Sequence, residues 1–336
     1  MRAEELLRPD EAGLYSPLGD FHIDPVRPVR RALITHGHSD HARSGHGAVL
    51  ATTETLAIMR ARMGDGYAGA TQSAPWGATI SLGGTEVTFH PAGHVLGSAQ
   101  ISVTAGGMRV VASGDYKRAA DPTCLPFEPV ACDVFITEAT FGLPIFRHPP
   151  AEEEAGKLLS SIAQFSDRTH LVGAYSLGKA QRVIKLLRGA GYDRPIYLHG
   201  SLDALCRLYQ NFGIDLGDLR PATVEGGTTD FAGAIVIAPP SAFGERWSRR
   251  FRDPVFAFAS GWMRIRQRAK QQGVELPLVV SDHADWDELC TTIRDSGAGE
   301  VWVTHGREEA LVHWCGLAGI AAKPLHLVGY EDATVE

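Results

Sequence analysis

The chain has 336 residues, of which 44% are hydrophobic and 21% are charged. This ordinary globular composition excludes a disordered or low-complexity protein, and the length suggests about two domains. No apolar run approaches the roughly 18 residues that cross a bilayer. Residues 1–13 lack the apolar core of a signal peptide, and the five cysteines form no CxxC motif. We therefore expect a cytoplasmic protein without a membrane segment.

Short apolar runs alternate with helical patterns along the chain, which predicts an α/β fold. Strands are predicted at residues 31–35, 85–89, 100–104, 108–112, 134–137, 277–280 and 301–304. Helices are predicted at residues 52–62, 151–165, 179–188, 202–212, 285–295 and 307–317. The pair Gly106-Gly107 indicates a hairpin. Many of these strands stop at a histidine or a carboxylate, and in α/β proteins chemistry gathers at strand ends.

The chain changes character after Phe141. The segment GLPIFRHPP is rich in proline and glycine and opens a new series of strands and helices, which runs to about Gly273. Polar strand ends of the first kind then resume. We predict a first domain formed by residues 1–145 and 274–336, with a second domain, residues 146–273, inserted into it.

Four potential metal ligands follow the first predicted strand within six positions: His36, His38, Asp40 and His41. Alternate residues of an extended segment point the same way, so His36 and His38 can address one ion. Asp40 and His41, past the turn, can address a second. Neutral imidazole and carboxylate suit zinc and other first-row divalent ions. A polar turn with capping residues is the plainer alternative.

Two ions need further ligands. His94 lies in the glycine-flanked turn PAGHVLGS, which allows close backbone approach. Asp115, in SGDY, follows another predicted strand. A carboxylate there can bridge two cations about 3.5–4 Å apart, the spacing of two-metal hydrolytic sites. Each residue alone is no more than a loop histidine or a turn aspartate.

In this order, HxHxDH, one histidine and one aspartate resemble the metallo-β-lactamase superfamily. The insertion and three later residues resemble its β-CASP nucleases, which implies an αββα sandwich with an inserted α/β β-CASP domain. In that group an acidic strand-end residue matches Glu138, a histidine after the insertion matches His283, and a last histidine matches His305. The superfamily's first aspartate, which orients metal ligands, matches Asp24, with Asp20 as its rival.

Longer boxes, namely GDFHIDP, SGWMRIRQR, SDHADW and LVGY, resemble bacterial ligase-associated DNA exonucleases. That resemblance implies a DNA exonuclease in DNA repair that acts on a single strand or an end, and an association with a DNA ligase. Among β-CASP relatives, a histidine at the motif position that His305 matches tends to accompany RNA substrates. An RNA-processing ribonuclease is therefore the alternative. We favour DNA because several boxes support it.

The resemblance implies two divalent ions, with zinc as the first expectation and manganese as the second. His36, His38 and His94 would hold one ion, Asp40, His41 and His305 the other, and Asp115 would bridge them. Asp40, Glu138 and His283 are the residues expected to act in catalysis. His283, polarised by Glu138, is the expected general acid. Its plainer alternative is a box that begins a helix at Trp286.

The substrate-binding candidates lie in the inserted domain. The segment SLGKAQ resembles a box of the β-CASP group, with Lys179 where arginine is common. Ser176 and Lys179 at a helix start favour a phosphate, although Ala180 excludes a P-loop. The whole chain has a net charge of −7, but the segment from Glu245 to Lys270 contains eight basic residues and only two acidic ones. Aromatic residues are interleaved with these charges. Arg264 and Arg266 are therefore predicted to bind nucleic acid.

Three alternatives remain for these substrate candidates and for the function. Lys179 is equally well explained as a solvated lysine at a capped helix, and the arginines as a solvated face. A small-molecule metallohydrolase is a second enzyme class, but small substrates need no inserted domain. A non-catalytic nuclease scaffold is a third reading, but such a protein is expected to have lost ligands, and here every expected position is filled.

Overall fold

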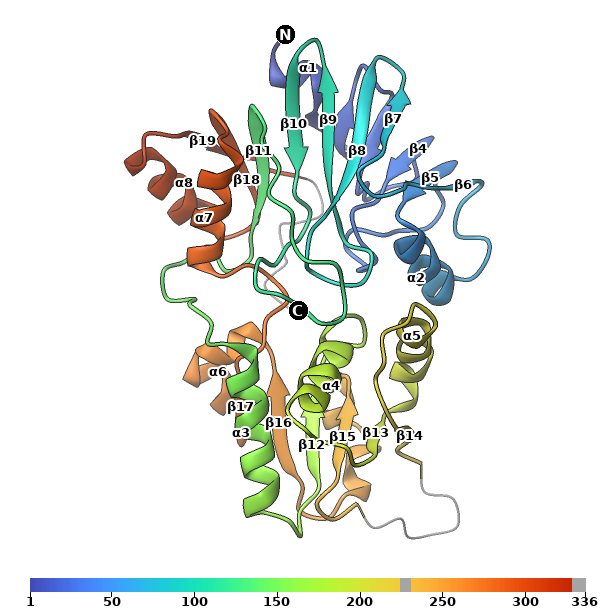
Figure 1. Cartoon of the computed structure of the whole chain (residues 1–336), viewed down its shortest axis with the longest axis vertical. Coiled ribbons are helices and arrows are strands. Elements are labelled where there is room, and N and C mark those ends of the chain that lie inside the picture. The colour runs from blue at the N-terminus through green and yellow to red at the C-terminus, as the bar shows by residue number, and fades with distance from the viewer. Residues whose placement is uncertain (224–230, 328–336) are drawn as a thin grey trace. The chain divides into compact units, whose positions relative to one another are not determined.

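The computed structural model describes residues 1–223 and 231–327. The last three residues of the LVGY box therefore lie outside the described residues. The chain divides into two compact units (Figure 1). The first unit comprises Met1–Arg147 and His283–Glu336, and the second comprises His148–Asp282. The second unit is thus inserted between the two segments of the first unit.

The first unit contains two mixed β-sheets. The first sheet has the order β1-β2-β3-β4-β5-β6, antiparallel from β1 to β3 and parallel from β3 to β6. Its strands are β1 (Arg8–Asp10), β2 (Gly13–Ser16), β3 (Phe21–Ile23), β4 (Arg31–Leu33), β5 (Ala48–Ala51) and β6 (Thr71–Ser73). All six strands are short, with three or four residues each, and the sequence pattern indicated only β4 among them.

The second sheet has the order β19-β18-β11-β10-β9-β8-β7. Its strands are β7 (Thr79–Leu82), β8 (Thr85–Pro91), β9 (Ala99–Ala105), β10 (Met108–Ala112), β11 (Val134–Ala139), β18 (Glu300–Gly306) and β19 (Ala321–Pro324). β9 and β10 form the hairpin predicted at Gly106-Gly107. β10, β11 and β18 run parallel, so the ends of these three strands meet at one edge.

The two sheets pack face to face around one apolar core, with helices on their outer faces (Figure 1). Phe21 and Leu33 from the first sheet meet Phe89, Ile101 and Trp302 from the second in this core. α2 (Thr53–Met63) covers the first sheet, while α7 (Trp286–Ser296) and α8 (Glu308–Leu317) cover the second. A short helix, α1 (Ala3–Leu6), contributes Leu6 to the core between the sheets. The four-layer αββα sandwich predicted for this part of the chain is confirmed.

The second unit contains one parallel sheet of order β14-β13-β15-β12-β16-β17. Its strands are β12 (His170–Gly173), β13 (Ile196–Leu198), β14 (Leu219–Pro221), β15 (Ile235–Ala238), β16 (Val255–Ala259) and β17 (Leu276–Leu278). Its helices are α3 (Ala151–Gln164), α4 (Lys179–Gly189), α5 (Gly200–Asn211), α6 (Arg266–Gln271) and the 3₁₀ turns η1 (Pro240–Gly244), η2 (Ser248–Arg250) and η3 (Gly261–Arg264). An all-parallel sheet places every strand's carboxyl end along one edge.

The second boundary differs from the one predicted. β17 pairs with β16, so residues 274–282 belong to the second unit and not to the first. A strand's sheet partner is chosen by tertiary pairing, and the short run Leu276–Leu278 carries no signal that names its partner.

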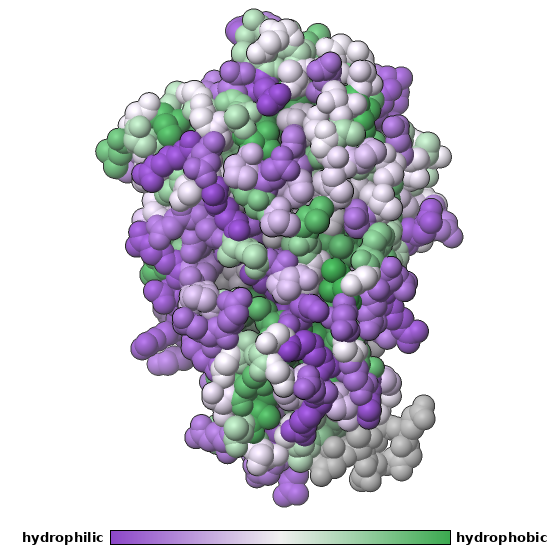
Figure 2. Space-filling view, in the orientation of Figure 1, coloured by the Kyte–Doolittle hydropathy of each residue, from purple (hydrophilic) through white to green (hydrophobic). Residues whose placement is uncertain are grey.

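Among residues 1–223 and 231–327, no helix combines the length and the apolar character needed to cross a membrane. Hydrophilic residues (purple) cover much of the face seen in Figure 2, interrupted by smaller hydrophobic areas (green). This is the ordinary surface of a globular protein.

Candidate metal centre

The segment after β4 carries the first four candidate ligands. Its backbone is tied to both sheets, because the Ile34 N–H donates to the Leu50 carbonyl of β5 and the Thr35 carbonyl accepts from the Ala99 N–H of β9. His36 follows immediately and is fully buried. The chain thus leaves the sheet at a fixed point, and the ligand-rich loop begins there.

His94 lies in the turn between β8 and β9. The Ser98 hydroxyl oxygen accepts the N–H groups of His94 and Val95, each at 3.1 Å. Gly93 has a φ of +73°, and a Cβ at this position would lie 2.2 Å from the Lys117 carbonyl oxygen. Only glycine allows this close approach, which holds the fully buried His94 against the loop after β10.

Asp115 and His305 come from β10 and β18, the two strands that flank β11 in the second sheet. Asp115 follows β10, and His305 lies near the end of β18 with a φ of 56°, a left-handed conformation that is uncommon outside glycine. Its Nδ1 lies 2.9 Å from Asp115 Oδ1. Backbone strain of this kind is concentrated at functional sites.

The structure brings the predicted ligands together in two groups that share Asp115: His36, His38, His94 and Asp115, and Asp40, His41, Asp115 and His305. Within each group the potential ligand atoms all lie within 4.8 Å of one another. In the first group, His38 Nδ1 is 3.1 Å from His36 Nε2 and 3.0 Å from His94 Nε2. Asp115 Oδ2 is 3.5 Å from His36 Nε2 and 3.3 Å from His41 Nε2.

These distances fit a divalent cation. Ligands about 2.1 Å from a tetrahedral ion stand roughly 3.4 Å apart, which is the separation of these ring nitrogens and carboxylate oxygens. Asp40 Oδ1 is also buried with no hydrogen-bond partner among the described residues. An unpaired buried carboxylate oxygen is costly unless something else compensates it, as a metal ion does.

In the metal-free cluster, the electrostatics favour the ligand forms of His36 and Asp115, and the protonated form of His305. Burial, with the imidazole of His41 acting in the same direction, lowers the pKa of His36 well below its ordinary value. Burial alone would raise the pKa of Asp115, but the adjacent histidines, His41 first, lower that pKa well below its usual range. Burial opposes the charge on His305, yet Asp115 raises the pKa of this imidazole. A neutral His36 and an ionised Asp115 are the states that bind metal.

A histidine–carboxylate pair lies beside the two groups. His283 Nδ1 is 2.9 Å from Glu138 Oε2 and 4.0 Å from Asp115 Oδ2. Glu138 is the residue before the last of β11 and is 2% exposed. The Thr140 hydroxyl donates to the same Glu138 oxygen at 2.6 Å. The Glu138 carboxylate therefore orients the His283 ring with Nδ1 toward it.

The alternative explanation for His283 is also present in the structure. Asp285 caps α7, and the Asp285 side chain and Glu288 form a capping box. The SDHADW segment thus begins a helix and places His283 near Asp115 at the same time, so the two interpretations do not compete.

Asp24, and not Asp20, contacts the ligand set. Asp24 is 6% exposed, and its Oδ2 lies 2.8 Å from His41 Nδ1. Asp20 is exposed and pairs with Arg30. Thr35, which the sequence did not single out, donates its N–H and its hydroxyl to Asp24 at 2.8 and 2.5 Å. Its position directly before His36 was the available signal.

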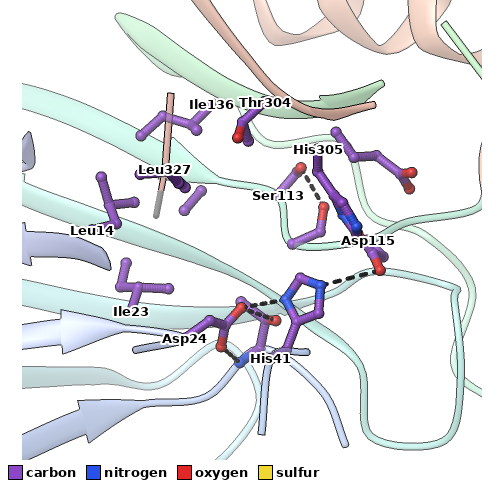
Figure 3. A pocket seen from close by; sticks show the side chains of 14 residues that line it. Leu14, Ile23, Asp24, His41, Ser113, Asp115, Ile136, Thr304, His305 and Leu327 are labelled. Carbon is purple, nitrogen blue, oxygen red and sulfur yellow. Dashed lines mark hydrogen bonds and ion pairs between the residues drawn. The ribbon is translucent and has the colours of Figure 1, made fainter. Parts of the chain in front are cut away.

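A cavity of about 40 Å³ lies behind the second group (Figure 3). Asp24, His41, Asp115 and His305 border it on one side, and apolar side chains border it on the other, namely Leu14, Ile23, Ile136 and Leu327. Ligand pockets usually measure roughly 300–1,000 Å³. This cavity is therefore too small for a nucleotide and is part of the packing behind the ligands.

The substrate-binding candidates of the second unit are not alike. Arg264 and Arg266 are exposed, and Ser176 is half-buried beside the start of α4. Lys179, by contrast, is 3% exposed, and its ammonium donates to Asp282 Oδ1. The expectation that Lys179 offers its charge to a phosphate, and the alternative of a solvated lysine, are both corrected: a buried carboxylate already neutralises this ammonium.

Comparison with known proteins agrees with this geometry. The model of the metallo-beta-lactamase superfamily matches residues 22–169. A protein of Opitutus terrae named "Probable DNA ligase" is 30% identical over 326 residues, which is 90% of this chain and 30% of that protein. The Neurospora crassa "Endoribonuclease ysh-1" is 30% identical over 243 residues, 59% of this chain and 28% of that protein. The chain spans less than a third of the length of these curated relatives.

A solved structure shares the fold. The crystal structure of an Enterococcus faecalis protein of unknown function superposes with a TM-score of 0.57 at 13% sequence identity, covering 90% of this chain and 80% of that one. At this identity the likeness concerns the fold alone. The segment that the family model matches, residues 22–169, contains five of the candidate ligands, namely His36, His38, His41, His94 and Asp115. The metallo-beta-lactamase superfamily model thus matches the segment that carries these five residues, and the chain has the metallo-β-lactamase fold.

Proposed function

We propose that this chain is a metal-dependent nuclease that hydrolyses phosphodiester bonds, and that it degrades DNA from an end as part of DNA repair. The observation that carries the proposal is the pair of ligand groups sharing Asp115, with the His283–Glu138 pair beside them. Two ions bridged by a carboxylate are typical of enzymes that hydrolyse phosphate esters.

His36, His38 and His94 would hold one ion and Asp40, His41 and His305 the other, with Asp115 common to both. Zinc suits this nitrogen-rich donor set, and manganese suits its carboxylates. When bound, such ions supply Lewis acidity and lower the pKa of a water that attacks phosphorus. The protein's part is to hold the donors in place from the ends of β4, β10 and β18 and from the turn between β8 and β9.

His283 is proposed to donate the proton that the departing oxygen needs. Glu138 accepts from Nδ1 at 2.9 Å, so the ring presents Nε2 as the second N–H of an imidazolium. An alkoxide is a poor leaving group, and a positioned acid contributes roughly 10²–10⁴-fold to such a step. Asp40 helps to fix the site, since its Oδ2 lies 3.6 Å from Nε2 of both His41 and His305.

Relatives bear on the choice between DNA and RNA in opposite directions. The Opitutus terrae relative is named a probable DNA ligase and matches 90% of this chain, which supports DNA and a functional association with a ligase. The Neurospora crassa relative is named an endoribonuclease, which keeps RNA as the second candidate. We favour DNA because the ligase-named relative matches more of the chain.

The exposed arginines of the second unit are proposed to bind the sugar-phosphate backbone. Arg264 ends η3 and Arg266 begins α6, both exposed. Between them and the buried β16 lies Trp262, whose ring carries Arg268 at 4.1 Å from its centroid. Positive charge beside aromatic rings is typical of sites for single strands.

End-labelled single- and double-stranded DNA and RNA, incubated with the purified protein and zinc or manganese, test the proposal. We expect metal-dependent shortening of labelled DNA from one end, faster than that of RNA. Asp115→Asn is the matched control and should be inactive, which excludes a contaminating nuclease. Preferred cleavage of RNA would transfer the assignment to the second candidate. Cleavage of neither, together with hydrolysis of a thioester or a lactam, would establish the small-molecule alternative.

A further inference from the structure

The two residues after Asp115 connect the loops that carry the candidate catalytic side chains. The Tyr116 N–H donates to Glu138 Oε1 at 2.8 Å, and the Tyr116 carbonyl accepts the Ala284 N–H at 2.6 Å. The Lys117 N–H donates to the Ala92 carbonyl at 3.0 Å. One short segment is thus bonded to the end of β11, to the residue after His283 and to the turn before His94.

The side chain of Lys117 extends this connection. Its ammonium donates to Glu288 Oε2, and the two side chains are only 6% and 17% exposed. The Glu288 carboxylate also accepts the Asp285 N–H at 2.9 Å and the Ala119 N–H at 2.7 Å. Glu288 therefore has three donors, one from α7's own start and two from the loop after Asp115.

A buried pair of this kind resists separation. Removing one partner leaves an uncompensated charge in a dry environment, which is strongly destabilising. The start of α7 cannot then move away from the loop after Asp115 without exposing or stranding a charge. Because His283 lies two residues before the α7 cap at Asp285, its backbone is held by the same contact.

We propose that Lys117 and Glu288 are positioning residues that keep the His283 ring on Glu138 and aimed at the departing oxygen. This inference rests on the proposed function, in which His283 is the general acid. Neither residue belongs to the two ligand groups. Lys117 follows the candidate ligand Asp115 by two positions, but its ammonium donates to Glu288. Their effect on the reaction is therefore transmitted through His283 and its backbone.

Substrates that differ in their leaving group separate positioning of an acid from general damage. A p-nitrophenolate departs without being protonated, whereas a nucleoside alkoxide needs an acid. Bis(p-nitrophenyl) phosphate and a DNA dinucleotide are the two probes, each assayed with the metal-loaded full chain. Bound metal is measured in every sample, and KM and kcat are obtained separately.

We expect Lys117→Met to lower kcat on the dinucleotide by about 10–100-fold, part of what a general acid contributes. Hydrolysis of bis(p-nitrophenyl) phosphate, KM and metal content should change less than about two-fold. His283→Ala should show the same selectivity, only stronger. The matched control is Lys157→Met, which strands the fully buried Glu154 in the second unit and should affect neither substrate.

Lys117→Met can also fail to fold, because it strands Glu288. The double variant Lys117→Met/Glu288→Gln removes both charges and is then the one assayed, with the same expected selectivity. Equal loss on both probes, or dinucleotide activity that returns with stability in the double variant, overturns the positioning role. If His283→Ala lowers activity on the dinucleotide and on bis(p-nitrophenyl) phosphate equally, His283 is not the general acid of the proposed function. The positioning role of Lys117 and Glu288 is then refuted as well.

Discussion

Asp24 Oδ2 lies 2.8 Å from Nδ1 of His41, while Asp24 Oδ1 accepts the N–H of Thr35. The aspartate has a φ of 45° and is 6% exposed. Because the carboxylate accepts from Nδ1, the other nitrogen of His41 faces Asp115, 3.3 Å from its Oδ2. Such a carboxylate sets the tautomer and the ring orientation of a metal ligand.

Asp24→Asn is therefore expected to weaken metal binding by about 10–100-fold, because an amide has one acceptor oxygen and cannot accept from both the Thr35 N–H and His41 Nδ1. Titration of the metal-free protein with zinc, followed by calorimetry, measures the change. Asp20→Asn is the control, since Asp20 is exposed and its carboxylate contacts Arg30 and the Tyr15 hydroxyl, which are not candidate ligands. Equal affinities for the two variants would refute the orienting role of Asp24.

The double substitution Arg264→Gln/Arg266→Gln should weaken single-stranded DNA binding without loss of metal. Each lost phosphate contact reduces the slope of log affinity against log salt by about 0.7 for a single strand, so two contacts reduce it by about 1.4. Fluorescence anisotropy at several salt concentrations gives the slope. Arg207→Gln, an exposed arginine on α5 paired with Asp203, is the control. An unchanged slope would show that these two arginines are a solvated face.

Gly306→Ala should destabilise the metal-free protein by about 3 kcal/mol. Gly306 has a φ of +135°, and a Cβ there would lie 2.2 Å from the Ala139 carbonyl oxygen. Gly297→Ala separates clash from backbone strain: its φ is +62°, but nothing lies within 4 Å of the added Cβ, so the cost should be about 1 kcal/mol. Urea unfolding midpoints provide the comparison, and equal midpoints would contradict the clash.

The metal-free protein should lose stability as the pH falls below about 6.5, the ordinary pKa of histidine. Burial lowers the pKa of His36, His46, His90 and His170, so the unfolded chain binds protons that the folded chain excludes. This stability is complete above the unfolded pKa and is lost on acidification.

His305 acts in the opposite direction. Its raised pKa contributes stability at low pH that disappears as the pH rises through the folded value. Four histidines with lowered pKa values destabilise the folded protein at low pH, and only His305 acts against them. The melting temperature of chelator-treated protein should therefore be lower at about pH 5.5 than at about pH 7.5. The reverse order would mean that His305 outweighs the other four.

The ligand types and their local spacing could be read directly from the sequence. Imidazole and carboxylate at alternate positions after a strand imply a metal whatever the rest of the chain does, because few other arrangements tolerate four such groups together. Strand and helix periods were equally local: α3 was predicted at 151–165 and is Ala151–Gln164, and α7 was predicted at 285–295 and is Trp286–Ser296. The resemblance to the metallo-β-lactamase superfamily is confirmed by the match over residues 22–169.

Other features depended on partners far away in the chain. Asp24 and Asp20 are alike in sequence, and only the packing of β3 against β4 places Asp24 on His41 and leaves Asp20 at the surface. The charge of Lys179 was visible, but its neutralisation by Asp282, 103 positions later, was not. The same holds for Lys117 and Glu288, 171 positions apart.

The sequence by itself thus determined which side chains were available for metal chemistry and which strands and helices carry them. The tertiary structure alone decided which of those groups meet, which charges are already neutralised and where one unit ends and the other begins. The physical reason is that propensity and spacing act over a few residues, whereas burial and ion pairing act through space between residues that the fold brings together.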